Sequence, residues 1–113
     1  MIEVYRAAAD LQRRCEDRGW RFCLIGGIAL QRWGEPRETI DVDVTLLTGM
    51  PFEESAVARA TPYEFAPGIF LLTASAEDLI VMKAFAGRAG GESTSFGRLP
   101  GSYSTPAGSL PSA

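Results

Sequence analysis

Residues 40–47 (IDVDVTLL) constrain the fold more than any other stretch of the chain. Apolar and polar side chains alternate there with the two-residue period of a β-strand, so Val42 and Val44 share one face. Asp41 and Asp43 share the other face, about 7 Å apart along the backbone. Two carboxylates this close repel each other unless a cation binds between them or one is protonated. Because hard oxygen ligands select Mg²⁺ or Mn²⁺, the strand predicts a metal site at these two aspartates.

A glycine pair, Gly26 and Gly27, precedes this strand at the junction of two further elements. Residues 20–25 predict a short buried strand, and residues 28–33 predict a short helix. Backbone N–H groups at the start of a helix attract anions, and glycines let a phosphate approach closely. A glycine pair at such a junction is also a common tight turn. Its spacing matches neither a Walker loop nor the GxGxxG pattern, which argues against a dinucleotide-binding fold.

Helical periodicity predicts long helices over residues 2–18 and 75–86. A further helix over residues 51–60 is predicted from Pro51 at its start and from Glu53 and Glu54 near its positive end. Gly19 is suited to end the first helix, and Ser75 with Asp78 has the spacing of a capping box at the start of the helix over 75–86. Between the helices over 51–60 and 75–86, two short apolar runs flank Pro67-Gly68 and predict a β-hairpin.

The composition limits the classes of protein to which the chain can belong. It has 113 residues, a net charge of −3, no histidine and two cysteines, Cys15 and Cys23. These features exclude histidine catalysis and the common zinc sites, and they indicate a small domain without an overall basic field. We expect both thiols to be reduced core residues of a cytoplasmic protein without a signal peptide or membrane span. Residues 1–88 would form the domain, and the Gly-, Ser- and Pro-rich residues 89–113 a disordered tail.

The stretch GGIALQRWGEPRETIDVDV resembles the nucleotidyltransferase superfamily with the DNA-polymerase-β-type fold. It is most similar to the small bacterial branch that includes AbiEii-type toxins and minimal nucleotidyltransferases. The later stretch TASAEDLIVMKAFAGR resembles the helix that follows the catalytic core in that branch. The resemblance covers roughly residues 1–88, and it implies a truncated α+β fold in which helices flank a small mixed sheet.

The resemblance also implies an activity and a set of site residues. The activity is transfer of a nucleoside monophosphate from an NTP to a hydroxyl, with Mg²⁺ or Mn²⁺ and release of pyrophosphate. For a toxin, the acceptor would be tRNA or another RNA, and an antitoxin would be a partner. Asp41 and Asp43 would be the catalytic, metal-binding carboxylates. The nucleotide-binding residues would be Gly26, Gly27, Arg37, Thr39 and Lys83.

Some of these assignments have plain structural alternatives. Arg37 is equally explained as a solvated charge, and Lys83 as a lysine whose stem lies along an apolar helix. The family also uses a third carboxylate on the strand beside the two aspartates, and the sequence offers only Glu64, in a short β-like run, as a weak substitute. Two hypotheses therefore stay open, a working nucleotidyltransferase and a remnant that binds nucleotide or a partner without turnover.

Overall fold

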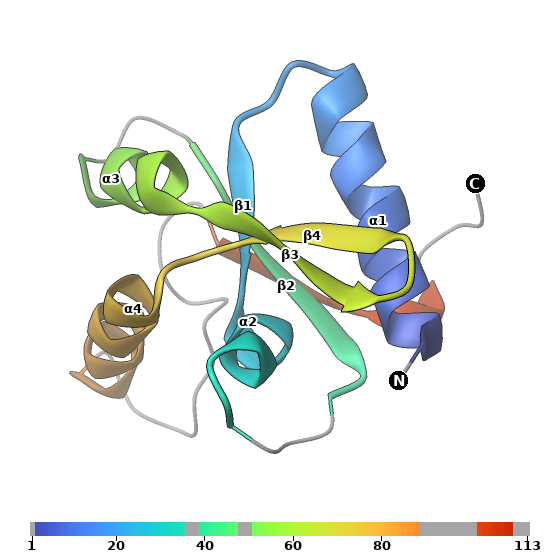
Figure 1. Ribbon diagram of the computed structural model, residues 1–113. Helices are drawn as coiled ribbons and strands as arrows, with labels where there is room; N and C mark the ends of the chain where they lie inside the picture. Colours follow the sequence, from blue (N-terminus) through green and yellow to red (C-terminus); the bar gives the residue numbers. More distant parts are fainter. Residues whose placement is uncertain (1, 36–38, 48–50, 89–101, 110–113) are drawn as a thin grey trace.

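The computed structural model describes residues 2–35, 39–47, 51–88 and 102–109. Within these ranges the chain forms an α+β domain with four α-helices, a five-stranded mixed sheet and a short 3₁₀-helix (Figure 1). The elements are α1 (Ile2–Asp17), β1 (Phe22–Ile25), α2 (Gly26–Arg32), β2 (Asp41–Leu46), α3 (Pro51–Arg59), β3 (Thr61–Ala66), β4 (Ile69–Thr73), α4 (Ala76–Arg88), β5 (Ser102–Pro106) and η2 (Ala107–Ser109).

The strands lie in the order β3-β4-β1-β2-β5. β1 and β2 are antiparallel, with Ile25 opposite Asp43, and β1 is parallel to β4, with Leu24 opposite Thr73. β3 and β4 form the antiparallel hairpin that the sequence predicts around Pro67-Gly68. The expectation of a small mixed sheet flanked by helices is therefore confirmed, while the resemblance to one family stays a prediction.

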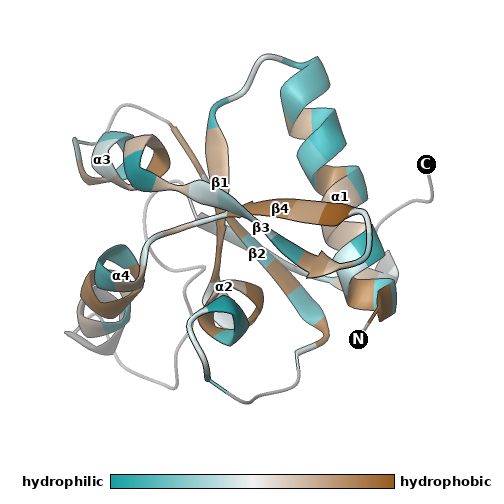
Figure 2. Cartoon of the chain, viewed as in Figure 1, coloured by the Kyte–Doolittle hydropathy of each residue, from teal (hydrophilic) through white to brown (hydrophobic). Residues whose placement is uncertain are grey.

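The sheet separates two hydrophobic clusters. α1 lies on one side of the sheet, and α3 and α4 lie on the other (Figure 1). Figure 2 shows hydrophobic residues on β1 and β4 at the centre of the molecule and polar residues along much of α1. The first cluster consists of Val4, Ala8, Cys15, Phe22, Leu24, Ile28, Val42, Val44 and Leu71. The second consists of Cys23, Ile25, Ala29, Ala56, Val57, Ala74, Leu79 and Met82.

The end of α1 follows the sequence signal at Gly19. Gly19 has φ +71° and donates its N–H to the carbonyl of Glu16 at 3.0 Å, while the N–H of Trp20 reaches the carbonyl of Cys15 at 2.9 Å. These are the two hydrogen bonds of a Schellman motif, for which a glycine is favoured. This cap satisfies backbone groups that a helix leaves unpaired at its end.

The two cysteines are buried and reduced, one in each cluster. Burial, together with the nearby charge of Asp78, raises the pKa of Cys23 to about 12. Burial also raises the pKa of Cys15. Because the thiolate is the reactive form and a raised pKa disfavours it, neither thiol is activated as a nucleophile. The expectation of two core thiols is confirmed. In the part of the chain that the structure describes, no helix is both long enough and apolar enough to cross a bilayer.

The predicted disordered tail is wrong for residues 102–109. β5 pairs with β2 over five residues, from Asp41 opposite Pro106 to Thr45 opposite Ser102. The N–H of Ala107 then donates to the carbonyl of Ile40 at 2.7 Å. An edge strand is held largely by backbone hydrogen bonds, so a segment with few large apolar side chains can still form one.

A side chain from α1 bonds to the backbone of β4, whose ladder with β1 is short. The parallel ladder between these strands comprises the single pair Leu24 and Thr73. Gln12 donates from Nε2 to the carbonyl of Phe70 at 3.0 Å, and its Oε1 accepts the N–H of Leu72 at 2.8 Å. Its amide thus bonds to β4 as a peptide group of a neighbouring strand would.

We expect Gln12→Leu to lower the free energy of unfolding by about 1–2 kcal/mol, because two backbone groups of β4 lose their partners. The free energy of unfolding of Gln12→Glu should fall between those of Gln12→Leu and the wild type. This variant keeps the acceptor for the N–H of Leu72 and loses the donor to the carbonyl of Phe70. Urea denaturation measures both changes. An unchanged midpoint in Gln12→Leu would show that water replaces the side chain without loss.

Candidate functional site

The first part of the candidate site is the contact between Gly26 and Asp43. The residue before the glycine pair, Ile25, lies directly opposite Asp43 in the sheet. Gly26 has φ +68°, and a Cβ built there would lie 2.7 Å from Cγ of Asp43 and closer still to Oδ2. A side chain is therefore excluded by the backbone conformation and by the carboxylate that occupies the space.

The second part is the contact between Gly27 and Thr39. A Cβ on Gly27 would lie 2.9 Å from Cβ and 3.0 Å from Oγ1 of Thr39. Oγ1 of Thr39 also accepts the backbone N–H of Asp41 at 3.2 Å, which fixes the start of β2. The two glycines therefore hold two successive parts of the segment that carries the aspartates.

Along β2, the predicted alternation of faces is confirmed. Val42 is 0% exposed and Val44 is 6% exposed, and both belong to the cluster under α1. Asp41, Asp43 and Thr45 occupy the opposite face, with both aspartates half-buried and Thr45 buried. Both aspartates are therefore only partly exposed, and Oδ1 of Asp43 is shielded from solvent.

The structure brings together five of the residues that the sequence singles out: Gly26, Gly27, Thr39, Asp41 and Asp43. Arg37 lies outside the described residues. Lys83 is exposed on α4, a helix that contacts α2, and the structure does not place its ammonium group on either carboxylate.

The glycine pair has a different structural reason from the expected one. The sequence suggests that the missing side chains leave room for a phosphate. In the structure, the carboxylate of Asp43 and the side chain of Thr39 fill the space beside the two glycines. The two glycines thus let β2 lie close to the start of α2. A phosphate could reach Gly26 and Gly27 only from another side.

Glu64 does not supply a third carboxylate at this site. It lies on β3, at the far edge of the sheet, and its Oε2 accepts the N–H of Gly68 at 3.0 Å within the hairpin. The strand beside the aspartates is instead β5, which places Ser104 opposite Asp43 and Pro106 opposite Asp41. Ser104 is the neighbour that the sequence analysis missed, because the pairing of β5 with β2 has no local signal.

The donor chemistry at the site is that of a hard divalent cation. Two carboxylates and nearby hydroxyls are oxygen ligands of the kind that Mg²⁺ and Mn²⁺ take, and Gly26 allows one carboxylate to lie against the backbone bend. Among residues 2–35, 39–47, 51–88 and 102–109, no three or more Cys, Asp and Glu side chains gather in a group that could hold a metal ion. The residues fit a cation held by two carboxylates.

A second ionic group, between α3 and α4, is structural. Asp78 is 2% exposed, and Arg59 donates to it from Nε at 3.0 Å and from Nη2 at 2.5 Å. Ser75 donates its hydroxyl to the same carboxylate at 2.7 Å and accepts the N–H of Asp78 at 3.1 Å. Ser75 therefore caps α4 as predicted, and Arg59 is an ion-pair partner that the sequence did not indicate.

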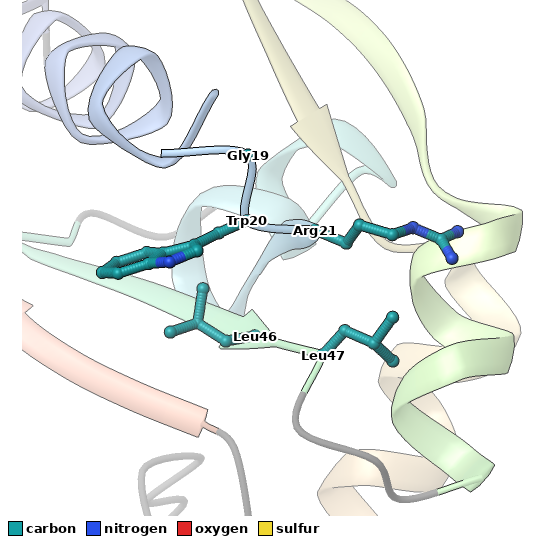
Figure 3. A pocket seen from close by; sticks show the side chains of 5 residues that line it. All are labelled: Gly19, Trp20, Arg21, Leu46 and Leu47. Carbon is teal, nitrogen blue, oxygen red and sulfur yellow. The ribbon is translucent and has the colours of Figure 1, made fainter. Parts of the chain in front are cut away.

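Two surface hollows lie away from the carboxylates. One, of about 350 Å³, lies beside the far end of β2, where the side chains of Trp20 and Leu46 lie next to each other (Figure 3). The other, of about 590 Å³, lies between α1 and the hairpin, with Arg6, Asp10 and Phe70 among its lining residues. Neither hollow includes a residue of the candidate site.

Comparison of the chain with protein-family models, with curated proteins and with solved structures finds no match in any of the three. The function of this chain is therefore inferred from its own residues and their arrangement.

Proposed function

We propose that the chain is a metal-dependent nucleotidyltransferase-like protein that transfers a nucleoside monophosphate from an NTP to a hydroxyl acceptor. The observation that carries the proposal is the packing of Asp43 on Gly26, with Asp41 on the same face of β2. It places the carboxylate of Asp43 against Gly26, and Asp41 follows on the same face of the strand. Binding a polyphosphate through a cation needs carboxylates that hold the cation next to a backbone that can contact the phosphates.

Each residue has a separate role in this proposal. Asp41 and Asp43 hold Mg²⁺ or Mn²⁺, and the cation, when bound, neutralises charge on the triphosphate. Thr39 holds the start of β2 through the N–H of Asp41, which keeps the first carboxylate in register. The backbone of the glycine pair, with Arg37 and Lys83, would contact the phosphates. Catalysis would consist mainly of positioning and charge neutralisation.

The acceptor and the setting belong to the same proposal. They are an RNA such as tRNA, in the cytoplasm, with an antitoxin as a partner chain. Without a third carboxylate to take the proton of the acceptor, the rate should fall by about 10²–10⁴-fold relative to a complete site. We therefore expect slow transfer.

A second candidate function is nucleotide or partner binding without turnover. The observation that favours it is the identity of the residues on β5, since Ser104 and Pro106 stand opposite the aspartates and neither is acidic. In this case Mg²⁺ and NTP bind together, and no product forms.

A transfer assay separates the two functions. The full chain is incubated with α-labelled NTPs, Mg²⁺ and total RNA, and labelled RNA is the expected product of the first. The double variant Asp41→Asn and Asp43→Asn should lose the label and keep its circular dichroism spectrum. Glu64→Gln, which removes a carboxylate in the hairpin, is the matched control and should keep the label.

The outcomes have distinct meanings. Label that survives the double variant would contradict the assignment of the aspartates. Calorimetry that detects Mg²⁺-dependent NTP binding without transfer supports the second function. Absence of both binding and transfer rejects the two functions together.

A further inference from the structure

The hydroxyl of Ser104 lies next to the proposed catalytic carboxylates. Ser104 is directly opposite Asp43 in the antiparallel pair of β2 and β5. Residues in this relation point to the same face, with Cβ atoms about 4.5–5.5 Å apart. Ser104 is exposed, so its hydroxyl can be reached from solvent.

The neighbouring hydroxyls are less accessible than that of Ser104 or lie farther from the carboxylates. Thr45 shares the face of Asp43 and is 1% exposed. Thr39 packs against Gly27, and its Oγ1 is occupied by the backbone of Asp41. Tyr103, with its exposed ring, lies opposite Val44 and therefore on the other face of the sheet. Of these hydroxyls, that of Ser104 is both near the carboxylates and accessible.

We infer that Ser104 is a site of self-modification, at which the chain attaches a nucleoside monophosphate from an NTP to its own β5. The inference rests on the proposed function. Oγ of Ser104 forms a bond to the α-phosphorus, and the bond from that phosphorus to the bridging oxygen of the β-phosphate breaks. Pyrophosphate leaves with the electron pair of that bond. The hydroxyl proton passes to a water molecule, because the described residues place no third carboxylate beside Asp41 and Asp43 to accept it.

The position of Ser104 on the same chain makes it a strong competitor for any external acceptor. A group held next to a reaction centre reacts as though present at a very high concentration, on the order of 10⁵ M or more in well-oriented cases. The product would carry a phosphodiester anion and a nucleoside beside Asp41 and Asp43. Repulsion and bulk would then keep a second NTP from the site, so each chain would react once.

Mass spectrometry tests the inference on the full-length chain. After incubation with Mg²⁺ and each of the four NTPs separately, the intact protein should gain the mass of one nucleoside monophosphate, located at Ser104 by peptide mapping. Ser104→Ala should lose the gain, and Ser104→Thr should retain it. Tyr103→Phe and Thr105→Val, which remove hydroxyls opposite Val44 and Val42, are matched controls that should modify normally. A yield independent of protein concentration shows reaction within one chain.

A second readout does not depend on activity. Mn²⁺ bound between Asp41 and Asp43 should broaden the amide NMR signal of Ser104 in the unmodified chain, as it should that of Asp43. If Asp43 broadens and Ser104 does not, β5 is not beside the site and the inference is overturned.

The possible results distinguish this inference from the proposed function. If RNA is labelled and Ser104 stays unmodified, self-modification is overturned and the proposed function survives. If neither RNA nor protein is labelled, both fail. If Ser104→Ala is still modified at another residue, the assignment to Ser104 is overturned. If the wild type is modified at Ser104 and Asp41→Asn is not modified, both proposals are supported.

Discussion

Gly26→Ala should lower the free energy of unfolding by about 2–5 kcal/mol, the sum of a backbone and a packing contribution. An alanine at φ +68° is strained by about 1–2 kcal/mol. The new Cβ would also overlap the carboxylate of Asp43, and such overpacking adds about 1–3 kcal/mol. Urea denaturation measures the loss, and nucleotide binding should fall with it because Asp43 must move.

The chain contains a matched control for this substitution. Gly19 has nearly the same conformation, φ +71°, with nothing within 4 Å of its built Cβ. Gly19→Ala should therefore show the backbone contribution alone. In the Gly26→Ala background, Asp43→Ala removes the carboxylate atoms and should recover part of the packing contribution. Equal losses for Gly26→Ala and Gly19→Ala would mean that Asp43 does not lie against the bend.

Asp78→Ala should lower the free energy of unfolding by about 2–3 kcal/mol at pH 7, because it removes a buried carboxylate that accepts charge-assisted hydrogen bonds from Arg59 and a hydrogen bond from Ser75. Burial raises the pKa of Asp78, and the hydrogen bonds from Arg59 and Ser75, with the charge of Arg59, outweigh that effect and lower the pKa below its usual range. Asp78→Asn keeps the shape of the side chain and loses the charge, so it isolates the ionic part.

The pH dependence follows from the direction of this shift. The folded carboxyl releases its proton more readily than the unfolded one, so the ionic stabilisation is complete above the unfolded pKa of about 4 and disappears as the pH falls through the folded value. The difference in stability between the wild type and Asp78→Asn should shrink in acid. Glu77→Gln, an exposed neighbour, is the control. A difference that stays constant from pH 7 to pH 3 would contradict the role of the charge.

The sequence predicts the local elements of this fold well, because their causes are local. The period of residues 40–47 determines which side chains of β2 share a face, and Val42 and Asp43 are on opposite faces as expected. The end of α1 at Gly19 and the capping of α4 by Ser75 follow from the needs of helix termini within a few residues.

The missed features depend on contacts between distant segments. Nothing near residues 102–106 indicates that they pair with β2, and nothing near Arg59 indicates that it binds Asp78 across two elements. The role of the glycine pair was predicted in part. Its place beside the aspartates was expected from the motif, while the occupation of its Cβ space by Asp43 and Thr39 depends on the strand register, which no local pattern specifies.

The pairing of β5 with β2 has a consequence for how the protein is made. Asp43 and Ser104 are separated by roughly sixty residues, so the ladder between them closes a long loop. During synthesis, β2 leaves the ribosome well before its outer neighbour exists, and its edge stays open to other chains for that interval. Nascent polypeptides that stall before residue 102 should therefore be captured by chaperones more readily than those released complete.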